Sequence, residues 1–139
     1  MQNSIKDIRF FSGGKAIFTV GNDKGNHYTY KIRQPKGENK PFFVSMLTGP
    51  MNDYDYTYLG IYNPNALNVY LTKKSKYNEE SIPVKVIRWA IRQIANKATL
   101  PVGYSIQHEG KCCRCGRTLT VPESIESGWG PECIKHFAR

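Results

Sequence analysis

Short apolar and aromatic segments separated by polar runs recur through the first half of the chain, and this pattern predicts β-strands. Five segments are rich in β-branched and aromatic residues, which favour extended backbone, and polar or glycine-containing runs separate them. The first two segments flank the turn-forming run 21–26 and predict a β-hairpin. The five predicted strands cover residues 15–20, 27–33, 42–47, 56–62 and 68–72.

In two of these segments the side chains alternate in kind, and this alternation assigns one face of each to the core, because successive side chains of a strand point to opposite faces. In segment 27–33, we expect Tyr28, Tyr30 and Ile32 to be buried. The cations Lys31 and Arg33 then lie on the opposite, exposed face of the predicted sheet.

In segment 56–62, tyrosines alternate with aliphatic residues, and we expect Leu59 and Ile61 to face the core. A row of tyrosines beside basic loops can stack unpaired nucleic-acid bases. Cross-strand packing is the commoner role of such a row, and we favour it here. The tyrosines of this row are Tyr54, Tyr56, Tyr58 and, beyond Gly60, Tyr62.

The hydrophobic period changes near residue 81, where apolar residues begin to recur at three- and four-residue steps. This spacing predicts a helix at about 81–98, with one apolar face. Ser81 suits the N-cap, Pro83 suits the first turn, and Pro101 and Gly103 follow the helix end. The predicted fold class is therefore α+β, with an antiparallel β-sheet crossed by one long helix.

All four cysteines of the chain lie near its C-terminus, which indicates a metal site. Cys112 and Cys115 form a C-x2-C pair, and Cys133 and His136 form a C-x2-H pair. Two such pairs are the ligand set of a tetrahedral structural zinc site. The sequence therefore predicts a bound Zn²⁺ ion with a structural role.

The fourth ligand of this site is open to three interpretations. His136 fits by its spacing from Cys133, and His108 is a rival because it precedes Cys112 by four positions. Cys113 is a third candidate, although chelation by it and by its neighbour Cys112 would be strained.

The segment around the cysteines predicts a small folded module of its own at 106–139, beside a basic β-rich domain at 1–105. The first cysteine pair suits a tight knuckle, and residues 118–123 suit a short hairpin. Pro131 suits the first position of a final helix that carries the second ligand pair. A knuckle, a hairpin and a ligand-bearing helix make a treble-clef or zinc-ribbon-like arrangement.

The chain is strongly basic, with 20 Lys and Arg against 11 Asp and Glu and a formal net charge of +9. Residues 1–105 hold almost all of the excess, and the cysteine module is nearly neutral. Such a charge attracts polyanions, among which nucleic acid is the commonest. A second basic group comprises Lys31, Arg33, Lys36 and Lys40. The predicted nucleic-acid-binding residues are Lys73, Lys74, Lys76, Lys85, Arg88, Arg92, Arg114 and Arg117.

Motifs of the common catalytic classes are missing from the sequence, so we expect no enzyme activity. A nucleotide-binding P-loop, a G-x-S-x-G elbow, an H-E-x-x-H helix and the zinc-deaminase pattern do not occur. No run of apolar residues is long enough to span a bilayer, and a secretory leader is not evident. We therefore expect no membrane partner and a reducing cytoplasm, where clustered cysteines favour metal over disulfides.

The residues from His108 to Ile125, with Gly128-x-Gly-Pro-x-Cys133, resemble a family of uncharacterised proteins that is common in bacteriophage genomes. The pattern of that family is similar to H-x-G-x-C-x-x-C-G-R-x-L-T-x-P-x-S-I followed by G-x-G-P-x-C. Cys113 departs from it, since a residue without a thiol is usual there. The resemblance implies a viral origin, a bacterial host cytoplasm and a small zinc-ribbon-like tail, and it implies no known activity.

The combined prediction is a phage-encoded, zinc-containing accessory protein that binds DNA or RNA. The alternative is a protein-directed inhibitor of a host complex, such as a nucleic-acid-guided antiviral defence machine. Both interpretations rest on the positive charge of the chain, and the sequence leaves the oligomeric state open.

Overall fold

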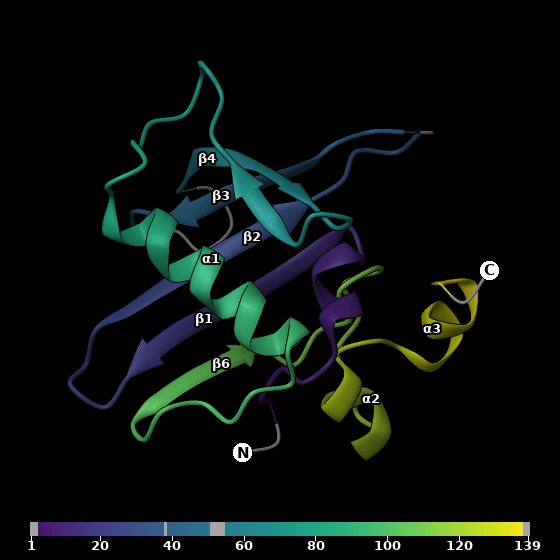
Figure 1. Cartoon of the computed structure of the whole chain (residues 1–139). Helices are drawn as coiled ribbons and strands as arrows, with labels where there is room; N and C mark the ends of the chain where they lie inside the picture. The colour runs from purple at the N-terminus through teal and green to yellow at the C-terminus, as the bar shows by residue number, and fades with distance from the viewer. Residues whose placement is uncertain (1–2, 38, 51–54, 138–139) are drawn as a thin grey trace.

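The computed structural model describes residues 3–37, 39–50 and 55–137, without the side chains of residues 136 and 137. Its centre is an antiparallel sheet of six strands in the order β5-β4-β3-β2-β1-β6 (Figure 1). The predicted α+β fold with an antiparallel sheet is confirmed. The strands are β1 (Lys15–Asn22), β2 (His27–Arg33), β3 (Phe42–Leu47), β4 (Tyr56–Asn63), β5 (Asn68–Tyr70) and β6 (Tyr104–His108).

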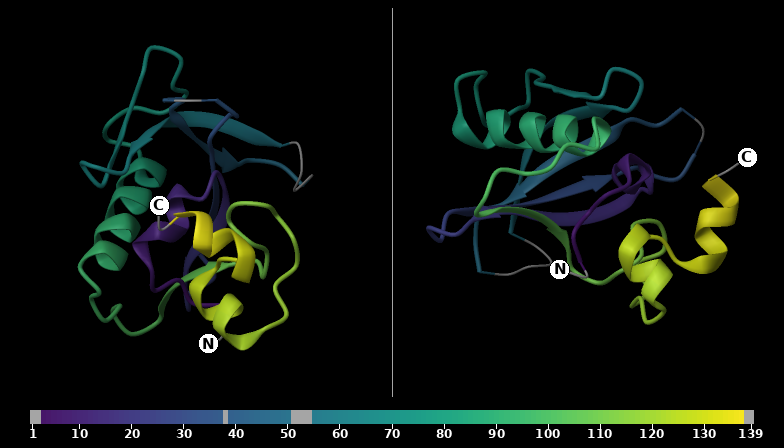
Figure 2. Two further views of the ribbon diagram at one scale, coloured as in Figure 1. Left: turned by 90° about the vertical axis from the view of Figure 1, so that its right-hand side faces the viewer. Right: turned by 60° about the horizontal axis from the view of Figure 1, so that its bottom comes forward.

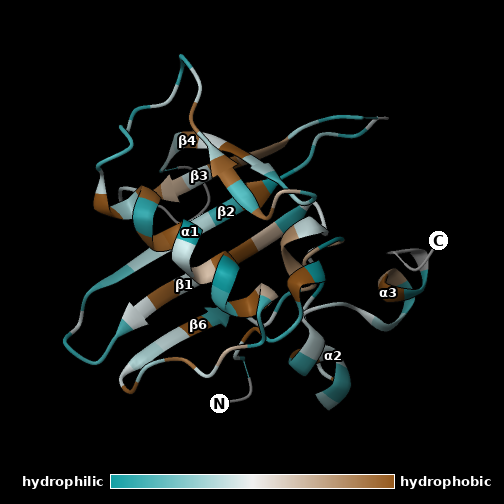
Figure 3. Ribbon diagram, in the orientation of Figure 1, coloured by the Kyte–Doolittle hydropathy of each residue, from teal (hydrophilic) through white to brown (hydrophobic). Residues whose placement is uncertain are grey.

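The helix α1 (Ile82–Ala95) lies across one face of this sheet (Figure 1). Brown and teal positions alternate around its turns in Figure 3, as expected for a helix with one apolar face. The helix ends before the predicted residue 98, because Lys97 has a left-handed φ of 51°. The buried residues of α1 are Val84, Ile87, Ala90, Ile91 and Ile94.

The N-terminus of α1 is fixed differently from the sequence prediction. Ser81 occupies the N-cap position, but its side chain makes no capping hydrogen bond to the helix. Its hydroxyl instead donates to the side-chain oxygen of Asn78 over 3.2 Å and accepts from the Asn78 backbone N–H over 3.0 Å. Hydrogen bonds also join α1 to the sheet: the Tyr30 hydroxyl donates to the Pro83 carbonyl over 2.7 Å, and the Arg88 Nε donates to the Val69 carbonyl of β5 over 3.0 Å.

Three shorter helices complete the fold: the 3-10 helix η1 (Ile8–Ser12), α2 (Pro122–Ser127) and α3 (Pro131–Phe137). The side chains of Phe10 and Phe11 in η1 are fully buried against Phe18 of β1. The sequence did not predict η1 or α2. Residues 122 and 123, which were assigned to a hairpin, are the first residues of α2, so that part of the prediction is wrong.

A β-bulge in β4 corrects the predicted faces of this strand. Gly60 pairs with Val44 and Tyr58 pairs with Ser45, so Leu59 is an additional residue between them. An additional residue reverses the alternation beyond it. Leu59 and Tyr62 are therefore both in the core, at 0% and 1% exposure, while Ile61 lies on the opposite face. Tyr54 falls outside the described residues.

Strand β6 was not predicted, and it pairs antiparallel with β1 at the edge of the sheet. The predicted division between residues 105 and 106 falls inside this strand. The sheet thus continues directly into the segment that carries the cysteines.

One hydrophobic core includes residues of the sheet and of the cysteine segment. Cys112, Cys113 and Trp129 are each 1% exposed and belong to the same cluster as Phe10. Among the described residues, no helix has both the length and the apolar character needed to cross a bilayer.

The Tyr30 hydroxyl offers a test of how α1 is attached. Burial raises the pKa of Tyr30, so the hydroxyl remains a protonated donor to the Pro83 carbonyl. We expect Tyr30→Phe to lower the free energy of unfolding by about 1–2 kcal/mol, because it leaves that carbonyl without this donor. Urea denaturation followed by circular dichroism measures the change.

Tyr28→Phe is the matched control, because Tyr28 is half-buried in the same strand and faces the same side. We expect a smaller change for the control. Equal losses of stability in the two variants would contradict the role of the Tyr30–Pro83 hydrogen bond.

Candidate metal centre

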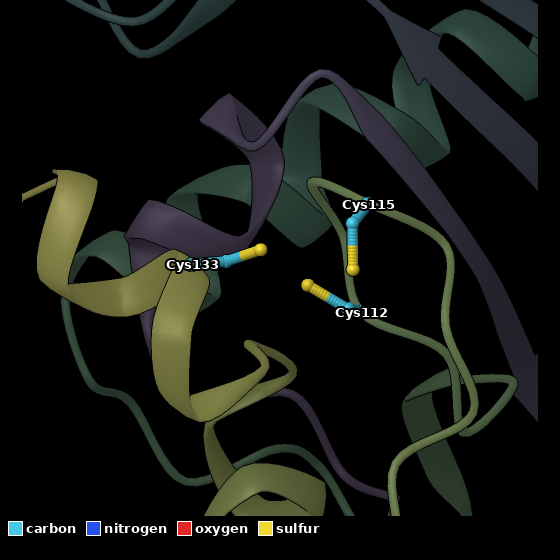
Figure 4. A group of neighbouring side chains, drawn as sticks. All are labelled: Cys112, Cys115 and Cys133. Atoms are coloured by element: carbon cyan, nitrogen blue, oxygen red, sulfur yellow. The ribbon is translucent and has the colours of Figure 1, made fainter.

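Three cysteine sulfurs converge at the C-terminal end of the fold. The Sγ atoms of Cys112, Cys115 and Cys133 all lie within 4.8 Å of one another, and they point toward one another in Figure 4. Cys112 and Cys115 come from the turn after β6, and Cys133 comes from the first turn of α3. Three thiols at this separation could hold a metal ion.

The first two cysteines are placed by a closed turn, which we call the knuckle (residues 111–118). The Cys112 N–H donates to the Arg117 carbonyl over 2.8 Å, and the Gly116 N–H donates to the Cys112 carbonyl over 3.0 Å. Gly116 has a φ of 81°, a conformation that side chains disfavour. The knuckle thus brings both sulfurs to one side, and the Cys113 N–H joins it to the Gly128 carbonyl over 2.9 Å.

The Cys112 sulfur has the environment of a thiolate. Its Sγ accepts hydrogen bonds from the backbone N–H groups of Gly130 over 3.1 Å and Arg114 over 3.4 Å. Burial acts to raise the pKa of Cys112, but N–H donors of Cys115, Gly130 and Arg114 outweigh it and lower the pKa to about 7. Since the thiolate is the form that binds metal, this environment fits a ligand.

The Cys133 sulfur has the opposite shift. Burial and the neighbouring sulfurs of Cys115 and Cys112 raise the pKa of Cys133. A second thiolate beside the first is unfavourable unless a cation lies between them. The three sulfurs therefore form a donor set whose charge a metal ion would balance.

His108 does not offer a free ring nitrogen to this site. Its Nε2 lies 2.6 Å from the Ile125 carbonyl, and its Nδ1 accepts the Gly110 N–H over 2.9 Å. The ring is 4% exposed and stacks on Phe10 at a centroid distance of 5.7 Å. His108 thus joins β6 to α2, and this geometry disfavours it as the rival fourth ligand.

The other two candidates for the fourth ligand are His136 and Cys113, and the structure describes the side chain of Cys113 alone. The side chain of His136 lies outside the described part, but α3 places positions 133 and 136 on one helix face. His136 therefore stays a prediction. Cys113 is not part of the cluster: its thiol is buried against Gly13, and this burial raises its pKa.

The predicted nucleic-acid-binding cations lie on three separate segments. Lys73, Lys74 and Lys76 are exposed in the loop after β5, Arg92 is exposed on α1, and Arg114 and Arg117 are exposed on the knuckle. The sequence did not indicate that two cations of α1 have acidic partners. Lys85 lies 3.5 Å from Glu80, and the half-buried Arg88 contacts Glu79 over 2.5 Å.

A basic hollow that was not predicted lies where the knuckle meets the sheet. Its volume is about 560 Å³, and it is lined by cations from β1, β2 and the knuckle. The alternation in 27–33 correctly placed Lys31 and Arg33 on the exposed face. Their proximity to the knuckle depends on the β1–β6 pairing, for which the sequence carried no signal. The cations of this hollow are Lys15, Lys31, Arg33 and Lys111.

Comparison with known proteins gives one match. A family of unknown function (DUF6011) matches residues 105–138, a minor part of the chain that includes most of β6, the knuckle, α2 and α3. The comparisons with curated proteins and with solved structures gave no match. The family match thus coincides with the cysteine cluster and carries no assigned activity.

Adjacent cysteines provide a matched test of the metal centre. We expect Cys112→Ala to remove the metal, because a site with one thiolate fewer holds zinc far more weakly. Cys113→Ala should retain about one metal ion per chain, because its thiol is not in the cluster. Elemental analysis of the purified variants measures the metal content. Equal metal content in the two variants would show that the cluster is not the binding site.

Alanine substitutions can also distinguish the roles of the two candidate histidines, His136 and His108. We expect His136→Ala to weaken zinc binding. His108→Ala should keep the metal and lose about 1–3 kcal/mol of stability, because two backbone groups lose their partner. Competition with a chromogenic chelator measures affinity, and thermal unfolding measures stability. Loss of metal from a folded His108→Ala protein would assign the fourth ligand to His108 instead.

Proposed function

We propose that this chain is a zinc-stabilised protein that binds nucleic acid and has no catalytic activity of its own. The observation that carries the proposal is the excess of nine positive charges together with the exposed positions of many of these cations. An excess of this size attracts a polyanion over about 8 Å at physiological salt. The bacteriophage origin and the bacterial cytoplasm implied by the sequence resemblance are part of the proposal.

The cysteine cluster supports the zinc part of the proposal. Cys112, Cys115 and Cys133 would hold the ion, with His136 as the fourth ligand. Zinc supplies cross-linking free energy between the knuckle and α3 when it is bound. Four protein ligands leave no open position for water, so the metal has a structural role in this proposal.

An alternative function is favoured by a different surface. Val102, in the loop before β6, and Tyr104, the first residue of β6, are exposed by 99% and 47%. A hollow of about 510 Å³ beside them is lined by Trp89 and Tyr104. Exposed apolar side chains around a hollow suit a protein partner. This surface supports the alternative of an inhibitor that docks on a host complex.

Nucleic-acid binding predicts a steep dependence on salt. We expect the metal-loaded protein to retard single- or double-stranded oligonucleotides in gels, with affinity falling at least about tenfold between about 50 and 200 mM salt. The reason is that each lysine or arginine on a phosphate displaces a condensed counterion. Titrations with DNA and with RNA at several salt concentrations measure the slope.

Absence of retardation even at the lowest salt would eliminate the proposal. If this chain then retains a host protein in stoichiometric amount from a nuclease-treated lysate, that result supports the alternative. Binding that does not change with salt would also contradict a phosphate-based interaction.

A further inference from the structure

We propose that a single-stranded polynucleotide binds across the face of the sheet that α1 leaves open, with its phosphates at the basic hollow beside the knuckle. This inference rests on the proposed nucleic-acid binding and assigns it a surface. The sequence indicates Lys31 and Arg33 as part of a second basic group, whereas its predicted binding residues lie on α1, the loop before α1 and the knuckle.

The open face is opposite α1. In the left view of Figure 2, α1 lies on one side of the sheet and the loop of the knuckle curls toward the other side. Among residues 3–37, 39–50 and 55–137, no helix covers this second face. Its side chains are therefore accessible to a ligand, and we call this surface the open sheet face.

One row of side chains crosses the open sheet face from β1 to β5. The strand registers place each member directly opposite the next: two cations come first, followed by an aromatic, an aliphatic and a second aromatic side chain. Five adjacent strands span about 19 Å at the usual strand spacing. The members of the row, in order, are Lys15, Arg33, Phe43, Ile61 and Tyr70.

The cationic end of this row is suited to phosphate. Lys15 and Arg33 are exposed and directly opposite, and no carboxylate of the described residues forms an ion pair with either. Like charges placed opposite each other destabilise a sheet. Lys31 and Lys111 line the same hollow, whose single acid, Glu109, lies 3.7 Å from Lys111. A polyanion would relieve this repulsion.

The other end of the row is aromatic. The Phe43 and Tyr58 rings lie 6.3 Å apart on the open sheet face at an interplanar angle of 60°. The Tyr58 hydroxyl is 3.0 Å from the Thr72 hydroxyl, which fixes the ring. Tyr70, at the edge of the sheet, is 47% exposed. Half-exposed rings of this kind stack on bases whatever their identity.

The combination favours a single strand over a duplex. In a duplex the bases stack on one another, and their faces cannot reach rings on a protein surface. Cations at one end of a row and rings at the other match a strand whose backbone and bases contact different side chains. The loop cations Lys73, Lys74 and Lys76 follow Thr72, so they lie near the aromatic end.

The test compares matched variants of the metal-loaded, full-length protein. Fluorescence anisotropy with an oligothymidine of about 12 nucleotides, and with its oligouridine counterpart, measures affinity at several salt concentrations. Lys15→Gln with Arg33→Gln removes two cations from the open sheet face. Lys85→Gln with Arg92→Gln removes two from α1 and serves as the control.

Aromatic variants test the other end of the row. Phe43→Leu removes a ring from the open sheet face and keeps an apolar side chain there. Tyr104→Leu removes an exposed ring that packs on Trp89 of α1, at a centroid distance of 5.5 Å, and is the control. Circular dichroism confirms that each variant is folded before its affinity is measured.

We expect the Lys15/Arg33 variant to bind at least about tenfold more weakly and its salt slope to fall by about 2, one for each phosphate contact. Phe43→Leu should weaken binding about tenfold with an unchanged slope. Both controls should change affinity much less. Larger losses in the α1 or Tyr104 controls, or tighter binding of a duplex, would overturn this assignment and leave the proposed function standing. Absence of all polynucleotide binding by the unchanged protein would remove both.

Discussion

The contact between Gly13 and Cys113 is the constraint on which the position of the cysteine segment depends. A Cβ atom at Gly13 would lie 2.5 Å from both the carbonyl oxygen and the sulfur of Cys113, so the two segments meet with no room for a side chain. Beside this contact, the Lys15 N–H donates to the Cys113 carbonyl over 2.6 Å. The start of β1 and the knuckle are thereby fixed to each other through their backbones.

Two surfaces follow from this attachment. Inside the contact, the Cys113 thiol is buried in the core, which leaves its neighbour Cys112 to face Cys115 and Cys133. On the surface of the protein, the knuckle lies beside the open sheet face, and Lys111 lines the same hollow as Lys15. The knuckle therefore contributes residues both to the cysteine cluster and to the basic hollow. Metal binding at the cluster would stabilise the wall of the hollow.

Much of the fold and part of the site could be read from local sequence. The segments 27–33 and 42–47 are strands with the predicted bounds, because side-chain alternation and turn residues are local properties. The cluster of Cys112, Cys115 and Cys133 likewise follows from two short spacings around a tight turn and a helix. The errors arose where a single residue changes the geometry: the bulge at Leu59 reversed the face of Tyr62, and Lys97 ended α1 early.

The sequence by itself determined the α+β class, most strands, the apolar face of α1, the three-cysteine cluster and the net positive charge. These features depend only on residue types and their short-range spacing, so they can be predicted without the tertiary contacts. The tertiary structure decided which of two adjacent buried cysteines faces the other two sulfurs, that His108 holds backbone groups, and which cations gather beside the knuckle. Each of these depends on pairing between segments far apart in the chain, since residues 23–103 separate β1 from its partner strand β6.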